Sequence, residues 1–115
     1  MDYEKMPTFV NHKGYTALQA YKSVGKGWRI LVRVALIYKP KDVLIVQVKE
    51  KYAGLRIYHE PYNERYQEVI NVLETVSFHT CEWCGKPGRV DKSYYWVITL
   101  CAECREKRKI AKNNE

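Results

Sequence analysis

At 115 residues, with hydrophobic side chains making up 46% of the total, the chain is long and apolar enough for one folded domain and is not a disordered polypeptide. Its formal charge of +7 favours polyanionic partners without identifying one. The sequence has no apolar run of the ~18 residues that a membrane span needs, and its acidic start, MDYEKMPTF, lacks the apolar region of a secretion signal, so we expect a cytoplasmic protein with reduced thiols.

The first third of the chain predicts two helices after a flexible arm. Residues 1–14 show no hydrophobic periodicity, and we assign them to the arm. The stretch YTALQAYKSV, residues 15–24, predicts a short helix that nearby glycines interrupt. Residues 28–39, WRILVRVALIYK, place apolar side chains at helical spacing up to Pro40, although their β-branched residues also permit a strand.

Residues 43–60, VLIVQVKEKYAGLRIYHE, predict an antiparallel hairpin. We place a two-residue turn at Ala53-Gly54, which pairs Lys51 with Arg56 and Lys49 with Tyr58. Alternation then gives one apolar face, formed by Val46, Val48, Leu55 and Ile57. The other face is polar and carries Gln47, Lys49, Lys51, Arg56 and Tyr58.

A second amphipathic helix follows Pro61, a residue that suits the first turn of a helix. Its apolar stripe consists of Tyr62, Tyr66, Val69, Ile70, Leu73 and Val76. This stripe predicts packing on the apolar side of the hairpin. Residues 15–80 therefore predict an α+β unit in which a hairpin lies between helices.

The last part of the chain contains four cysteines in the pattern C-x₂-C-x₁₆-C-x₂-C. This spacing is typical of a structural zinc site, in which four thiolates close a tetrahedron at ~2.3 Å from the ion. We predict one structural Zn²⁺ held by Cys81, Cys84, Cys101 and Cys104. A redox-active dithiol pair and an iron–sulfur cluster are the alternatives, while a closed four-sulfur set disfavours catalytic zinc.

The residues around the cysteines predict how this zinc module folds. Gly85 allows a positive φ in the turn after the first pair, and Pro87-Gly88 supplies a second turn before a hairpin. The second pair opens a basic helix that reaches Lys112. This order of knuckle, hairpin and helix resembles a treble-clef zinc finger, so residues 81–115 predict a module that extends the α+β unit.

Three motifs together, QVKEKYAGLRIY, CEWCGKPG and TLCAEC, resemble a family of small uncharacterised proteins from bacteria and their phages. The resemblance covers roughly residues 28–105. It implies a lysine-rich hairpin, a helix and a four-ligand zinc module, in a bacterial or phage setting. It implies no activity.

The functional hypothesis favoured by the charge pattern is a zinc-stabilised binding module that contacts nucleic acid. The candidate contact residues are Lys49, Lys51, Arg56 and Tyr58 of the hairpin and Arg105, Arg108, Lys109 and Lys112 of the last helix. Each surface taken alone also fits an ordinary solvated face. Glu50, Glu103 and Glu106 lie among these cations and weaken both patches.

The alternative is a protein-binding adaptor or a phage-encoded inhibitor of a host protein. Ten tyrosines together with Trp28, Trp83 and Trp96 suit aromatic anchors in an interface, although packing around the zinc knuckles also explains the rings, especially Trp96. The two hypotheses differ in where tyrosines point. Tyrosines clustered with lysines favour nucleic acid, whereas an exposed apolar patch favours a protein partner.

An enzyme, such as a nuclease on a treble-clef scaffold, would need a general base and metal-holding side chains close together. The candidates are His12, His59 and His79. We expect His59 to be exposed at a strand end and His79 to pack near the first cysteine pair. The sequence shows no catalytic motif around them, so we do not predict an enzyme.

Overall fold

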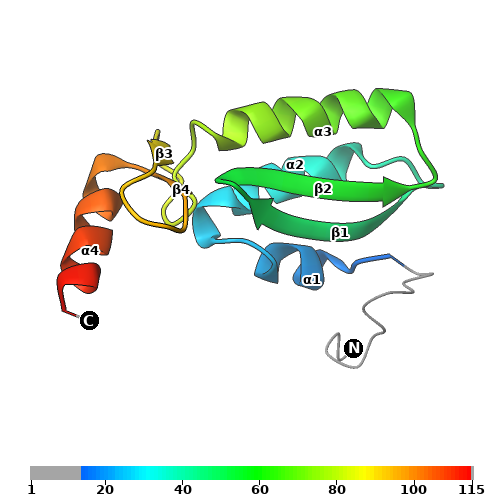
Figure 1. The fold of residues 1–115 in the computed structure, drawn as a ribbon. Coiled ribbons are helices and arrows are strands. Elements are labelled where there is room, and N and C mark those ends of the chain that lie inside the picture. The colour runs from blue at the N-terminus through cyan, green and yellow to red at the C-terminus, as the bar shows by residue number, and fades with distance from the viewer. Residues whose placement is uncertain (1–13, 115) are drawn as a thin grey trace.

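The computed structural model describes residues 14–114 and has an α+β fold, which confirms the predicted class (Figure 1). The described helices are α1 (Ala17–Lys22), the 3₁₀ helix η2 (Lys26–Trp28), α2 (Arg29–Tyr38), α3 (Glu64–Ser77) and α4 (Ala102–Asn113). The strands form two antiparallel hairpins, one of β1 (Leu44–Lys51) and β2 (Gly54–Glu60), the other of β3 (Arg89–Asp91) and β4 (Ile98–Leu100). Apart from Gly14, the predicted arm lies outside the described residues.

Local signals in the sequence explain where the first helices begin and end. Thr16 caps α1 by accepting a hydrogen bond from the Gln19 backbone N–H, and the Gln19 side chain accepts one from Thr16 N–H in return. Helix α2 starts directly after η2 and ends at Tyr38, before Pro40. Of the two conformations that residues 28–39 permit, the structure therefore shows a helix, which spans residues 29–38. Over residues 14–114, no helix has the length and apolar run that a membrane crossing requires.

The β1–β2 hairpin is present, but its predicted turn is one residue too late. The turn residues are Tyr52 and Ala53, so Lys51 pairs with Gly54 and Lys49 pairs with Arg56. The glycine serves packing instead of the turn: a Cβ on Gly54 would lie 2.5 Å from the Phe78 ring. The predicted pairs of Lys51 with Arg56 and Lys49 with Tyr58 are wrong for this reason.

A bulge in β1 also changes the predicted apolar face. The pairing register of β1 with β2 shifts between Ile45 and Gln47. As a result Ile45 is buried, while Val46 is only half-buried. Beyond the bulge the alternation holds, and Val48, Leu55 and Ile57 are buried in the core. The polar face predicted for Lys49, Lys51, Arg56 and Tyr58 is retained.

The helices enclose the apolar face of this hairpin. In Figure 1, α2 lies behind the hairpin, α3 runs along β2 and α1 lies beside β1. Tyr66, Ile70 and Leu73 of α3 are buried as predicted, and the Tyr66 hydroxyl donates a hydrogen bond to the Ala35 carbonyl oxygen at 2.6 Å. Tyr62, which lies before the helix N-cap, and Val76 are exposed, so the stripe is narrower than predicted.

The cysteine-containing part is docked on this unit through the turn between α1 and α2. Gly27 N–H donates to the Glu82 carbonyl oxygen at 2.7 Å, and the Trp28 indole donates to the Thr80 carbonyl oxygen at 2.8 Å. A Cβ on Gly27 would overlap the carbonyl oxygen of Cys81 and come within 2.8 Å of Cys84 N. Glycine is needed here because two backbone segments touch.

Candidate metal centre

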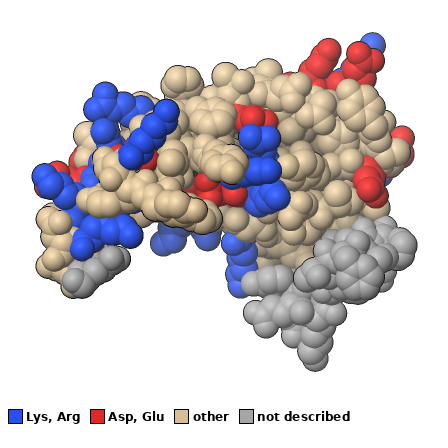
Figure 2. All heavy atoms as spheres, in the orientation of Figure 1, with Lys and Arg blue, Asp and Glu red and all other residues tan. Residues whose placement is uncertain are grey.

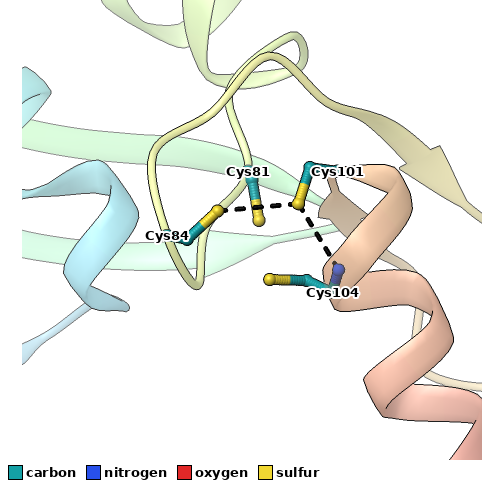
Figure 3. A group of neighbouring side chains, drawn as sticks. All are labelled: Cys81, Cys84, Cys101 and Cys104. Atoms are coloured by element: carbon teal, nitrogen blue, oxygen red, sulfur yellow. Dashed lines mark hydrogen bonds between the residues drawn. The ribbon is translucent and has the colours of Figure 1, made fainter.

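The four predicted ligands converge on one point (Figure 3). The sulfur atoms of Cys81, Cys84, Cys101 and Cys104 all lie within 4.8 Å of one another, and the Cys84 and Cys101 sulfurs are 3.5 Å apart. Four sulfurs at ~2.3 Å from a common ion would be about 3.8 Å apart in a tetrahedron. The set is therefore close enough to hold one metal ion, and its chemistry fits a closed tetrahedral thiolate site.

The first pair lies in a tight turn before β3. Cys81 N–H donates to the Lys86 carbonyl oxygen at 2.8 Å, and Gly85 N–H donates to the Cys81 carbonyl oxygen at 2.9 Å. Gly85 has a φ of +87°, which confirms the conformation predicted for this position. The turn aims both thiols toward the start of α4 (Figure 3).

The second pair opens α4. Cys101 is the N-cap residue, and its sulfur accepts a hydrogen bond from Cys104 N–H at 3.4 Å. This bond, together with contacts from the other three cysteine sulfurs, lowers the pKa of Cys101 to about 7, whereas burial raises the pKa of Cys104. A metal ion that binds here replaces the thiol protons and leaves thiolate charge at the positive end of the helix dipole.

A small core supports the site. Cys81, Cys101 and Cys104 are buried together with Ile98 and Leu100 of β4, while Cys84 is exposed. The thiols are thus largely shielded from solvent and held by short elements on both sides.

Arg108 lies inside this module and not on its surface. Its guanidinium pairs with Asp91 at 3.1 Å, where the two side chains are 7% and 4% exposed, and it also donates to the Trp96 carbonyl oxygen. Burial alone would raise the pKa of Asp91, but hydrogen bonds from Ser93 and Arg108 outweigh it and lower the pKa. Arg108 therefore joins α4 to the β3–β4 hairpin and is not available as a surface contact, unlike the role predicted for it.

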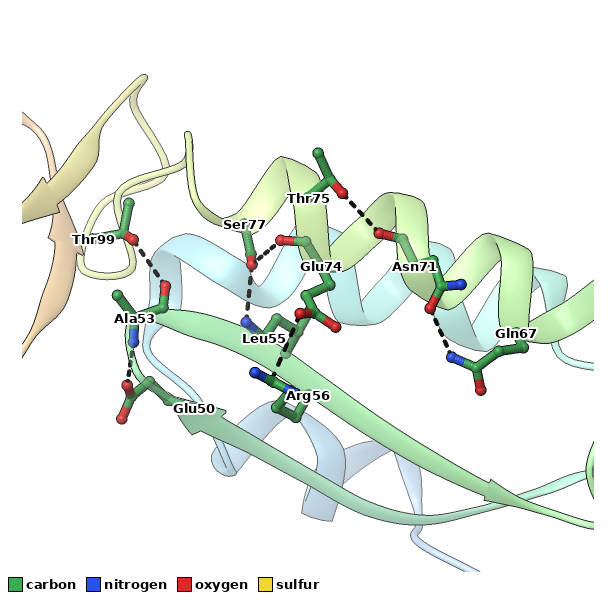
Figure 4. Close-up of polar contacts among 10 residues, drawn as sticks. All are labelled: Glu50, Ala53, Leu55, Arg56, Gln67, Asn71, Glu74, Thr75, Ser77 and Thr99. Atoms are coloured by element: carbon green, nitrogen blue, oxygen red, sulfur yellow. Dashed lines mark hydrogen bonds and ion pairs between the residues drawn. The ribbon is translucent and has the colours of Figure 1, made fainter.

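The predicted hairpin contacts share the outer face of β1–β2. Lys49 Nζ lies 5.6 Å from the centre of the Tyr58 ring, and Lys51 Nζ lies 6.0 Å from that of Tyr52. Arg56 is half-buried and lies 3.7 Å from the Glu74 carboxylate of α3 (Figure 4). Lysines and tyrosines thus cluster on the outer face of the hairpin, while Glu74 partly neutralises the charge of Arg56.

The remaining predicted contacts lie on α4. Lys109 and Lys112 are exposed, Arg105 is half-buried, and Lys112 Nζ lies 5.6 Å from the centre of the Tyr94 ring. Figure 2 shows Lys and Arg side chains gathered at the end of the molecule formed by α4 and β3–β4. The structure therefore separates the hairpin and helix surfaces, each of which pairs cations with a tyrosine.

The tryptophans and histidines depart from several expectations. Trp28 is fully buried, but Trp83 is 40% exposed and Trp96 is 62% exposed, so packing around the knuckles does not explain Trp96.

His59 is half-buried and its ring contacts the Gln67 side chain at 3.0 Å, whereas His79 is exposed. His12 lies outside the described residues. The two described histidines do not meet the metal centre.

Comparisons with models of protein families, with curated proteins and with solved structures found no match to this chain.

Proposed function

We propose that this chain is a zinc-stabilised module that binds nucleic acid through the outer face of the β1–β2 hairpin and the exposed side of α4. The observation that carries the proposal is the pairing of cations with tyrosine rings, at Lys49 with Tyr58, Lys51 with Tyr52 and Lys112 with Tyr94. Lysines neutralise phosphates, and aromatic rings stack on bases, so both chemistries lie side by side.

The proposed metal is one structural Zn²⁺. Four thiolates supply a closed set without an open position for water, which supports an architectural role over a catalytic one. The order of Cys-x-x-Cys turn, β3–β4 hairpin and α4 supports assignment to the treble-clef type. In this arrangement the ion holds α4 and the β3–β4 loop in position for recognition.

The resemblance to small proteins of bacteria and their phages supports a bacterial cytoplasm as the setting. It adds weight to the hairpin because the motif QVKEKYAGLRIY contains Lys49, Lys51 and Arg56. The proposed partner is a cellular or phage nucleic acid.

The test is the salt dependence of binding to a labelled single-stranded oligonucleotide, followed by fluorescence anisotropy. Replacing Lys49 and Lys51 by Gln should weaken binding and flatten the slope of log K against log salt by about 0.7 for each phosphate that is no longer neutralised. Lys41→Gln, at an exposed position before β1, is the matched control and should leave the slope unchanged. An unaltered slope in the double variant would remove the hairpin from the interface.

One observation favours the second candidate, a protein-binding adaptor or inhibitor. Leu18 of α1 and Ile30 of α2 are 50% and 58% exposed and border a hollow of about 480 Å³. Exposed apolar side chains of this kind suit a protein partner. If no oligonucleotide binds at low salt, Leu18 and Ile30 become the first residues to replace in a test for a protein partner.

A further inference from the structure

A hollow of about 420 Å³ lies between the tip of the β1–β2 hairpin and the loop that joins β3 to β4. The hairpin contributes Glu50, Lys51 and Tyr52, and the loop contributes Tyr95, Trp96 and Val97. Tyr52, Tyr95 and Trp96 are 75%, 99% and 62% exposed. Three large rings around one hollow, all open to solvent, form a surface that a flat ligand can cover.

Both walls of the hollow are fixed to the rest of the fold. The Thr99 hydroxyl donates to the Ala53 carbonyl oxygen at 2.8 Å, and both residues are fully buried (Figure 4). The Trp96 carbonyl oxygen accepts a hydrogen bond from Arg108, which the buried pair with Asp91 holds in place. The rings are therefore presented by an anchored backbone, which reduces the entropic cost of binding a ligand.

The backbone of the β1–β2 turn is a second indication that Tyr52 contacts a ligand. Tyr52 has a φ of 50° and Ala53 a φ of 72°, in the region that Asn and Gly adopt most readily in two-residue hairpin turns. A bulky side chain costs free energy in this conformation. Strain of this kind clusters at binding sites, and here it places an aromatic ring at the rim of the hollow.

One cation and one carboxylate line the hollow, and the cation lies beside an aromatic ring. Lys51 lines it, with its ammonium group 6.0 Å from the centre of the Tyr52 ring. The one carboxylate in the lining, that of Glu50, accepts a hydrogen bond from Ala53 N–H at 2.8 Å, which holds it in the turn while it keeps its charge. A ligand with a flat ring and a nearby phosphate matches this arrangement of rings and cation.

We propose that this hollow is a stacking subsite for an unpaired base of single-stranded nucleic acid, with Lys51 contacting the adjacent phosphate. This inference rests on the proposed function and makes it specific. Bases in a duplex are covered by their neighbours, so the rings of Tyr95 and Trp96 select single strands. The hairpin and α4 surfaces supply charge, and the hollow supplies the preference for unpaired bases.

The experiment compares oligo(dT) with an abasic oligomer of the same length and charge, and with a duplex. Oligo(dT) should bind more tightly than the abasic oligomer. Tyr95→Ala and Trp96→Ala should each weaken oligo(dT) binding by about 5- to 100-fold while leaving the weak binding of the abasic oligomer unchanged. Tyr38→Ala is the matched control, since Tyr38 is 64% exposed but ends α2, away from the hollow.

Tryptophan fluorescence supplies a readout that does not depend on affinity alone. Oligo(dT) should quench the emission of the wild-type protein and of Trp83→Phe, but not that of Trp96→Phe, because a stacked base lies on the Trp96 indole. Thermal melting of each variant checks that the metal module remains folded. Quenching that persists in Trp96→Phe would overturn the inference.

The outcomes separate the inference from the function on which it rests. If oligo(dT), the abasic oligomer and the duplex bind equally, nucleic-acid binding stands but the stacking subsite is excluded. If none of them binds, both proposals fail, and the exposed rings are then assigned to a protein partner. Weakening confined to Tyr95→Ala and Trp96→Ala with oligo(dT) supports both.

Discussion

At the scale of single residues, Gly27 is the glycine of the described chain whose Cβ position lies closest to other backbone atoms. The first cysteine pair lies directly against it, so an added methyl group meets backbone atoms of Cys81, Cys84 and Gly85, none of which can rotate away. By contrast, the Cβ that would clash at Gly54 meets a phenyl ring, which is able to turn. Gly27 is thus the more stringent of the two positions.

We predict that Gly27→Ala lowers the free energy of unfolding by about 1–3 kcal/mol, the cost typical of overpacking. The reason is that the cysteine knuckle must move off the η2 turn to make room. Thermal or denaturant melting of the zinc-loaded protein measures the change. Lys26→Ala, at the exposed neighbouring position, is the control and should shift the curve by less than about 0.5 kcal/mol.

Individual residues also show where sequence patterns suffice. Cysteine spacing alone predicted which four side chains would meet, because two Cys-x-x-Cys turns leave few ways to arrange the ligands. The burial of Arg108 could not be read from its surroundings, since its neighbours in α4 are exposed cations and its partner, Asp91, belongs to β3. A charged residue in a basic run is assigned to the surface unless the partner is known.

At the scale of elements, the β1–β2 turn combines unfavourable backbone conformation with a functional position. Tyr52 is exposed, has a positive φ and lines the hollow that we assign to a base. A residue that adopts positive φ more readily at position 52 would stabilise the hairpin, but it would remove the tyrosine ring. Stability and recognition are therefore opposed at this position.

We predict that Tyr52→Asn raises the free energy of unfolding by roughly 0.5–1 kcal/mol, because Asn adopts positive φ at lower cost. The same variant should bind oligo(dT) less tightly than the wild-type protein. Melting and anisotropy measure the two effects. Tyr62→Asn, at an exposed tyrosine before α3, should produce neither effect; a loss of stability in Tyr52→Asn would show that the turn is not strained.

Element types followed from periodicity, but register did not. The predicted and observed turns differ by one residue because Gly54, the residue best suited to a turn, is instead required by the packing of Phe78 from the end of α3. The bulge near Val46 likewise has no local signature in an apolar run. The position of the turn and the bulge both depend on contacts between segments distant in sequence, and hydrophobic periodicity does not predict such contacts.

At the scale of the whole molecule, the four-cysteine module and the α+β unit share an interface. Gly25 N–H donates to the Glu82 carboxylate at 3.0 Å, Trp28 contacts Thr80, and Thr99 contacts Ala53. None of these pairs is marked in the sequence, because each joins positions whose proximity depends on the completed fold. Loss of the ion should therefore affect more than residues 81–114.

We predict that removing the metal with a chelator, or replacing Cys84 by Ser, unfolds the cysteine module and destabilises the α+β unit with it. Structural zinc contributes on the order of 10 kcal/mol to the folding of such modules. Elemental analysis measures the bound metal, circular dichroism follows the whole fold, and the emission of Trp28 in a Trp83→Phe, Trp96→Phe background reports the α+β unit. Cys84→Ser protein that retains one ion per chain and an unchanged melting curve would contradict a structural role.

The docking of the cysteine knuckle on the α1–α2 turn has a consequence for biosynthesis. Gly25 and the Glu82 side chain that it contacts are 57 positions apart, so at 5–20 residues per second the turn is synthesised about 3–11 s before its partner. During that interval the indole of Trp28 has no carbonyl to bind. Final closure of the N-terminal half thus waits until the tail has been translated. Under the proposed zinc role, the yield of native protein would then also depend on the supply of zinc.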